Sequence, residues 1–202
     1  MDDLLQSGLR QLGYRHPDVL SRRLLEYGEL LIAAGGHTNL VGPRNVEGLV
    51  VDHFLDCLAL PAAARPRSPA VDVGSGGGLP GIPLALAFPK VSFTLLEPRR
   101  RRAEFLAGAV AELGVDNVRV EASSVGAAVE RHGRTAAIAY ARALAKPPEA
   151  LRITLPALRE GGRAVLYVGR TEVPRGEDLA AAAEAGASLL EASRVVVPYS
   201  DT

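Results

Sequence analysis

The stretch VDVGSGGGLPGIPLALAF, residues Val71–Phe88, decides the fold. A short apolar run carries Asp72 and ends at a loop in which five of the eight residues Gly74–Gly81 are glycine. Glycine lets the backbone adopt positive φ and approach a ligand closely. The apolar segment after the loop starts with two prolines, which suit the first turn of a helix. The stretch therefore predicts a strand over Ala70–Val73, a ligand-binding turn, and a helix over Pro80–Phe88.

The alternation of short apolar runs with helical segments continues to the end of the chain. Such an alternation predicts a parallel sheet with helices on both faces. The fold class is therefore α/β, with a Rossmann-like doubly wound, mostly parallel sheet. The further strands are expected at Val91–Leu96, Val118–Glu121, Ala136–Tyr140, Ala164–Val168 and Arg194–Val197, and the helices at Pro98–Leu113, 125–132, Pro148–Leu158 and 176–186.

The first 60 residues lack this alternation and are helical in pattern. Apolar residues recur at helical spacing after Pro17, and again in a second segment whose apolar face includes Cys57. The glycine-containing loop 34–44 separates the two segments. We expect an N-terminal helical region, 1–60, packed on a Rossmann-like domain, 68–202, whose final strand is missing or incomplete.

Composition excludes several classes of protein. The 202 residues carry no net charge, so a basic nucleic-acid-binding surface must be local. A single cysteine excludes a disulfide within one chain, and four scattered histidines give no metal-ligand spacing. No segment has the length or composition of a signal peptide or a membrane span. We expect a cytoplasmic monomer without a metal and without a membrane partner.

Two ligands fit the glycine loop, and the first is a dinucleotide, whose pyrophosphate would bind at the helix N-terminus. Residues 76–81 match the dinucleotide pattern G-x-G-x-x-G, but that frame starts two residues after the strand has ended. In the frame that starts at the strand end, Leu79 occupies the position of the third glycine. S-adenosylmethionine is the other ligand. Both need an acidic residue at the end of the second strand for the ribose hydroxyls, and Glu97 has that position. A tight turn without a ligand is the remaining interpretation.

Several motifs together resemble one family. They are V-D-V-G-S-G-G-G-L-P-G-I-P-L from Val71, F-T-L-L-E ending at Glu97, A-R-A-L-A around Arg142, N-L at Asn39–Leu40 and H-F-L-D at His53–Asp56. Over residues 22–170 the chain resembles the bacterial small-subunit ribosomal RNA guanine-N7 methyltransferases, also called glucose-inhibited division protein B. The resemblance implies the class I methyltransferase type of sheet and S-adenosylmethionine as methyl donor. It also implies a guanine of 16S ribosomal RNA, in the 30S particle, as acceptor.

The resemblance implies a set of donor-binding residues. Glu97 would accept hydrogen bonds from the ribose hydroxyls, and Ser124 and Val125 would flank the adenine. Asp72 would orient the loop or bind the methionine amino group; its alternative is a purely structural bond to loop amides. For Glu97 the alternative is a solvated charge. The full set is Asp72, Gly74, Gly76, Gly78, Leu79, Glu97, Ser124, Val125 and Arg142.

The acceptor would be held mainly by arginine. Arg142 ends the fourth strand, and its planar guanidinium can bind a phosphate or guanine O6 and so position the acceptor for catalysis. Arg101 and Arg102 belong to a run of four arginines that opens a helix, and they are expected to contact RNA phosphates or to be merely solvated. Asn39 either binds RNA or braces its loop. His53 either lies near the cleft or packs between the two regions.

Three departures from the family pattern keep other functions open. Val168 stands where the family usually has a lysine, Ala137 where it has an aspartate, and the chain ends at Thr202 without the usual final strand. The neutral charge and the missing lysine favour a small-molecule acceptor for the same donor. A donor-binding, ribosome-associated module without catalysis is the next alternative, and a nicotinamide oxidoreductase is a distant one.

Overall fold

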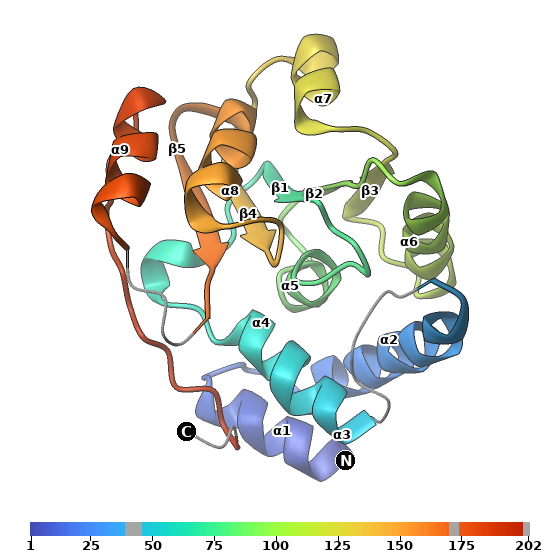
Figure 1. The fold of residues 1–202 in the computed structure, drawn as a ribbon. Coiled ribbons are helices and arrows are strands. Elements are labelled where there is room, and N and C mark those ends of the chain that lie inside the picture. Colours follow the sequence, from blue (N-terminus) through green and yellow to red (C-terminus); the bar gives the residue numbers. More distant parts are fainter. Residues whose placement is uncertain (39–45, 170–173, 200–202) are drawn as a thin grey trace.

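A five-stranded sheet in the order β3-β2-β1-β4-β5 forms the centre of the protein (Figure 1). The computed structural model describes residues 1–38, 46–169 and 174–199. Neighbouring strands are parallel throughout. Since the chain leaves β1 toward one edge and returns at β4 toward the other, the topological switch point lies between these two strands. The strands are β1 Ala70–Val73, β2 Phe93–Leu96, β3 Val118–Glu121, β4 Ala136–Arg142 and β5 Leu158–Tyr167.

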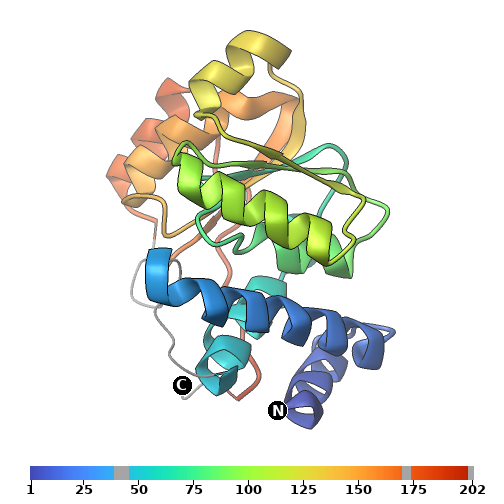
Figure 2. The ribbon, with the colours of Figure 1, turned by 90° about the vertical axis from the view of Figure 1, so that its right-hand side faces the viewer.

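Helices cover both faces of the sheet, as a doubly wound fold requires. On one face lie α5 (Gly81–Ala87) and α6 (Arg100–Glu112), and α2 (Pro17–Thr38) packs against both (Figure 2). The opposite face carries α7 (Val125–His132) and α8 (Pro147–Thr154), and α9 (Gly176–Glu184) packs against α8.

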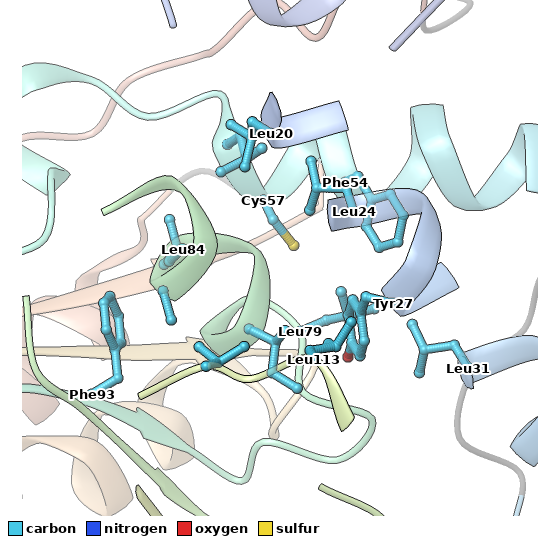
Figure 3. Close-up of a cluster of buried hydrophobic side chains, with 14 of the residues drawn as sticks. Leu20, Leu24, Tyr27, Leu31, Phe54, Cys57, Leu79, Leu84, Phe93 and Leu113 are labelled. Atoms are coloured by element: carbon cyan, nitrogen blue, oxygen red, sulfur yellow. The ribbon is translucent and has the colours of Figure 1, made fainter. Parts of the chain in front are cut away.

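The N-terminal region packs against the core side of the glycine loop. Its remaining elements are α1 (Asp2–Gln11), α3 (Val46–Leu49), a π-helical turn (Val50–Leu55), α4 (Asp56–Leu58) and a 3₁₀ turn (Ala62–Ala64). Figure 3 shows the buried cluster in which side chains from α2, the π-helical turn and α4 meet Leu79 of the loop and Leu84 of α5. Each fully buried large side chain of this kind contributes roughly 1.5–3 kcal/mol. Its members from the N-terminal region include Leu20, Leu24, Tyr27, Leu31, Phe54 and Cys57.

Most predicted elements are present, and three have the predicted bounds. These are β1, β3 and α7. The second strand starts two residues late because Val91 N donates to Phe88 O in a turn. The predicted loop 34–44 starts too early, since α2 runs to Thr38. The fold class is confirmed, with every strand pair parallel.

The predicted end of α8 and start of β5 are wrong. The α-helix ends at Thr154, and a 3₁₀ turn leads straight into β5 at Leu158. Pro156 explains the early end, because proline has no N–H to donate within a helix. Two glycines that the sequence placed before the strand lie inside it, where the register with β4 shifts. A Cβ on Gly162 would lie 2.9 Å from Ala136 O, so only glycine fits this irregularity.

The predicted last strand, Arg194–Val197, is also wrong. These residues are neither helix nor strand, and Val196 is 76% exposed. Strand propensity alone does not order a segment, because a strand needs a partner whose backbone groups it can pair with. The segment instead leads to Tyr199, whose hydroxyl donates to Ser7 Oγ at 2.6 Å. Among the helices that the structure describes, none is long and apolar enough to cross a membrane.

Candidate functional site

The glycine loop lies at the carboxyl end of β1, at the switch point of the sheet. Gly78 N donates to Ser75 O at 2.6 Å and closes a tight turn. The φ values of Gly74, Gly76 and Gly78 are +68°, +56° and +93°, which residues other than glycine rarely adopt. Within 74–79 only Gly74 and Gly76 are partly exposed. A ligand from solvent can therefore reach the loop only at these two glycines, whereas Gly78 and Leu79 face the core.

Asp72 connects β1 to the start of α5. Its Oδ2 accepts from Gly81 N at 3.1 Å, so the structural bond to a loop amide is present. The other oxygen, Oδ1, is buried and has no hydrogen-bond partner. Burial raises the pKa of Asp72 to about 7, against the hydrogen bonds that lower it. The side chain therefore brings one unused acceptor or, when protonated, one donor to the base of the loop.

Glu97 joins the glycine loop to the start of α6. Its Oε2 accepts from Gly76 N at 2.9 Å and its Oε1 from Arg99 N at 2.8 Å. The residue is only 3% exposed, so the solvated alternative is wrong. Each carboxylate oxygen has two lone pairs and uses one of them here. Glu97 can therefore hold the loop and still accept hydrogen bonds from a ligand's hydroxyls.

Arg142 connects the end of β4 to the N-terminal region. Its Nε donates to Asp56 Oδ2 at 3.1 Å, and its Nη2 donates to Asp52 O at 3.0 Å and lies 2.9 Å from His53 Nδ1. Burial and the neighbouring Arg142 lower the pKa of His53. The neutral imidazole can thus accept at Nδ1 from the guanidinium. The structure brings the two sequence-predicted residues together, with His53 between the two regions of the chain.

Two residues beside the loop gave no functional signal in the sequence. Tyr27 of α2 donates its hydroxyl to Gly77 O from beneath. Leu144 covers Gly74, where a Cβ would come within 2.5 Å of its Cδ1. Tyr27 is one member of an apolar helical stripe, and no local pattern separates it from its neighbours. Leu144 belongs to the A-R-A-L-A motif, but the motif alone assigns it no role; in the structure the preceding Ala143 has a strained φ of +51°.

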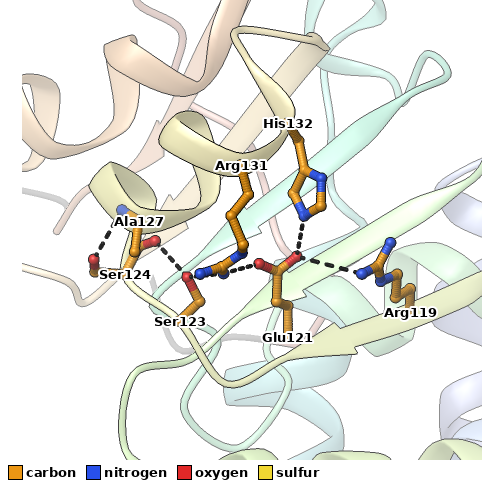
Figure 4. Close-up of polar contacts among 7 residues, drawn as sticks. All are labelled: Arg119, Glu121, Ser123, Ser124, Ala127, Arg131 and His132. Carbon is orange, nitrogen blue, oxygen red and sulfur yellow. Dashed lines mark hydrogen bonds and ion pairs between the residues drawn. The ribbon is translucent and has the colours of Figure 1, made fainter.

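The end of β3 holds a polar cluster, drawn in Figure 4. Glu121 contacts Arg131, His132 at 3.3 Å and Arg119 at 4.0 Å. Burial opposes ionisation of Glu121, but the hydrogen bond from Arg131 and the nearby arginine charges outweigh it and lower the pKa of Glu121. The cluster borders a cavity of about 220 Å³ between α7 and the sheet.

The two residues predicted to flank an adenine follow this cluster. Ser124 caps α7, because its Oγ accepts from Ala127 N at 3.3 Å. The side chain of Val125 is buried in the apolar cluster between α7 and the sheet. The structure therefore gives both residues a structural role at the start of α7, and the exposed Ser124 also borders the solvent.

The arginine run surrounds the start of α6. Arg99, Arg100 and Arg101 are exposed, and Arg100 pairs with Glu104 at 2.8 Å. Arg102 is half-buried, and its Nη1 lies 3.8 Å from the position of a Cβ on Gly76. The run therefore borders the exposed part of the glycine loop. Asn39 lies outside the described residues, and no group within them could hold a metal ion.

Comparisons with known proteins relate the chain to one family. The GidB family model, described as rRNA small subunit methyltransferase G, matches residues 20–196. The ribosomal RNA small subunit methyltransferase G of Mycolicibacterium vanbaalenii is 38% identical over 71% of this chain and 63% of its own length. The protein of that name from Mycobacterium sp. strain KMS is 38% identical over 80% and 72%. The chain thus spans less than two thirds of the length of the first relative and slightly more than two thirds of the second.

A solved structure has the same kind of fold. The crystal structure of a mutant of MtNAS superposes with a TM-score of 0.50, over 88% of this chain and 75% of that one. Since the two sequences are only 18% identical, the likeness concerns the fold alone.

Proposed function

The chain belongs to the rRNA small subunit methyltransferase G family, and from this premise we propose that it transfers a methyl group from S-adenosylmethionine to guanine N7 of 16S ribosomal RNA. The observation that carries the proposal is the bond between Glu97 and Gly76, 2.9 Å long, at the switch point of the sheet. We take the Glu97 carboxylate as the acceptor for the ribose hydroxyls, because it lies beside the partly exposed Gly76 at the point where doubly wound folds bind nucleotide ligands.

The residues present fit this methyl donor. Glu97 has lone pairs left for two ribose hydroxyls, and the open side of Gly76 leaves room for the ligand. The unpartnered Asp72 Oδ1 is an acceptor for the methionine ammonium group, which would also favour the ionised carboxylate. Ser124 and Val125 would border the adenine from the start of α7. When bound, S-adenosylmethionine supplies a methyl group on a positively charged sulfur.

The acceptor chemistry asks little of the protein beyond positioning. Guanine N7 has an in-plane lone pair and no proton, so no general base is needed for its attack on the methyl carbon. Alignment of the two reactants is then the main contribution of the site. Arg142 uses Nε and Nη2 for its contacts with the N-terminal region, which leaves Nη1 to donate to guanine O6 or to a phosphate. His53 and Asp56 would orient that guanidinium.

RNA would approach along the exposed start of α6. Arg101 is exposed there, and the Nη1 of the neighbouring Arg102 lies 3.8 Å from the position of a Cβ on Gly76 of the glycine loop. Phosphate contacts from such arginines raise affinity and make it salt-dependent. Asn39 remains a candidate RNA contact. We infer the two-part organisation as 1–60 and 68–202, with the donor site in the second part, and a monomer acting in the cytoplasm on the 30S particle.

Transfer of a labelled methyl group to 30S particles tests the proposal. The particles are reconstituted with unmodified 16S transcript, and the RNA is then digested to nucleosides and analysed by mass spectrometry. The expected product is 7-methylguanosine. Arg101→Gln should reduce transfer most at low salt and less as the salt concentration rises, because the lost phosphate contact also lowers the salt dependence of binding. Arg10→Gln, at an exposed residue of α1, serves as the matched control.

Other products would contradict the proposal in distinct ways. Methylation of another RNA atom would show that guanine N7 is not the acceptor. Donor binding without transfer to particle or naked RNA would favour a non-catalytic, ribosome-associated module. Turnover with a small acceptor alone would favour the small-molecule alternative, which the neutral net charge and Val168 support.

A further inference from the structure

We propose that Tyr27 is a positioning residue for the methyl donor: its hydroxyl, from beneath, sets the conformation of the glycine loop that receives the donor. This inference rests on the proposed function and adds a residue to the site from a part of the chain that contains no donor contact. It assigns the N-terminal helix α2 a role in donor binding that its apolar pattern alone does not suggest.

The contact that carries the inference is buried and specific. Tyr27 is 0% exposed, and its hydroxyl donates to Gly77 O, 50 residues further along the chain. The ring is stacked on Phe54 at a centroid distance of 5.8 Å and an interplanar angle of 28°. Figure 3 shows Tyr27 among the side chains beneath the loop. The ring is therefore held by packing, and its hydroxyl has a fixed direction.

The bond fixes a peptide plane within the loop. Because a peptide unit is planar, the direction of the Gly77 carbonyl also fixes that of the Gly78 amide. That amide donates to Ser75 O at 2.6 Å and closes the turn. On the other side of the turn, Gly76 N donates to Glu97 at 2.9 Å. Tyr27 and Glu97 thus hold the loop from two sides, with the partly exposed Gly76 between them.

The next glycine of the loop packs closely against Tyr27 and two apolar side chains. A Cβ on Gly78 would lie 2.6 Å from Tyr27 Oη, 2.8 Å from Ile82 Cδ1 and 2.9 Å from Leu106 Cδ2. Gly78 therefore allows α2 to lie close to the loop, because any larger residue would collide with Tyr27. Burial also raises the pKa of Tyr27 well above its ordinary value, so the hydroxyl remains a donor across the physiological range.

Phe54 extends the connection to the acceptor side. It belongs to the π-helical turn Val50–Leu55, which also carries His53 and precedes Asp56, the two side chains that contact Arg142. The stacked pair of Tyr27 and Phe54 therefore links the donor loop to the turn whose His53 contacts the guanidinium proposed to position the acceptor.

Tyr27→Phe tests the inference, with Tyr140→Phe as its matched control. Tyr140 is also 0% exposed, and its hydroxyl also donates to a buried backbone carbonyl, that of Ala64 at 2.8 Å. Each variant loses one buried hydroxyl and keeps the ring, so both should lower the unfolding temperature to a similar extent. The affinity for S-adenosylmethionine, measured by calorimetry, should fall about tenfold in Tyr27→Phe alone.

A second measurement reports the conformational stability of the glycine loop in the absence of the donor. Hydrogen exchange of the free protein should be faster for the amides of residues 74–79 in Tyr27→Phe than in Tyr140→Phe or the wild type. Unchanged donor affinity and unchanged loop exchange in Tyr27→Phe would overturn the inference, as would equal effects in the two variants. A wild type that bound no S-adenosylmethionine would overturn the proposed function. Faster exchange confined to Tyr27→Phe would, even then, support the role of Tyr27 in setting the loop.

Discussion

Arg142 Nη2 lies 2.9 Å from His53 Nδ1, and this contact joins the end of the sheet's fourth strand to the N-terminal region. The two residues are 89 positions apart in the chain. Protonation of His53 would turn an acceptor into a cation that faces a guanidinium. The contact therefore makes the stability of the protein depend on pH.

The first prediction concerns acid stability. Because folding lowers the pKa of His53 through burial and Arg142, the unfolded chain binds the proton more tightly. The contribution of neutral His53 to the free energy of unfolding is therefore complete above pH ~6.5 and is lost as the pH falls below that value. His53→Asn keeps an acceptor and removes the titration. Urea denaturation at pH 7.5 and 5.5 should show a steeper acid loss in the wild type, by less than about 1 kcal/mol since His53 is half-exposed. Parallel losses in the two proteins would contradict this.

The second prediction has the opposite sign and concerns Asp72. Folding raises its pKa to about 7, so the folded state binds the proton more tightly than the unfolded chain does. Its contribution to stability is therefore most favourable at acid pH, and declines as the pH rises from about 4 to about 7. Relative to Asp72→Asn, the wild type should lose at least about 1 kcal/mol over that range. Denaturation curves of both proteins between pH 4 and 8 measure it, and a constant difference would refute the buried carboxyl's raised pKa.

The third prediction concerns the packing of the glycine loop on α2. Gly78→Ala would place a Cβ against Tyr27, Ile82 and Leu106 at a φ of +93°, and should destabilise the protein by about 2–4 kcal/mol. Gly108→Ala in α6 meets no atom within 4 Å and should stabilise by about 0.5–1 kcal/mol. The free energy of unfolding in urea measures both. Similar effects in the two variants would contradict the close approach of α2.

Local signals predicted the part of the fold that local residues determine. The first and third strands and α7 follow from apolar runs bounded by glycine, asparagine and serine, and the structure has them at the predicted bounds. Pro156 is a local signal for the early end of α8, whereas Gly161 and Gly162 resemble strand breakers but lie inside β5. Arg194–Val197 shows the limit, because its strand propensity was real and its partner strand is absent from the described residues.

The candidate site likewise contains residues that local sequence marks and contacts that only tertiary packing creates. Glu97 and the glycines were identifiable because a strand end and a loop composition mark them. The partners of Arg142 come from positions 86–90 residues earlier, and Tyr27 reaches the loop from 50 residues away. No periodicity or spacing encodes such contacts, since they depend on how α2 and the π-helical turn pack beneath the sheet.

Calorimetric titration with S-adenosylmethionine and with NAD tests the central claim most directly. The titration uses the wild type, Glu97→Gln and, as a control, Glu121→Gln, which changes a strand-end glutamate that contacts arginines beside α7. We predict micromolar binding of S-adenosylmethionine alone, weakened at least about tenfold in Glu97→Gln and unchanged in Glu121→Gln. Binding of NAD in its place, no binding of either ligand, or equal affinity in wild type and Glu97→Gln would contradict the assignment of the glycine loop and Glu97 as the methyl-donor site.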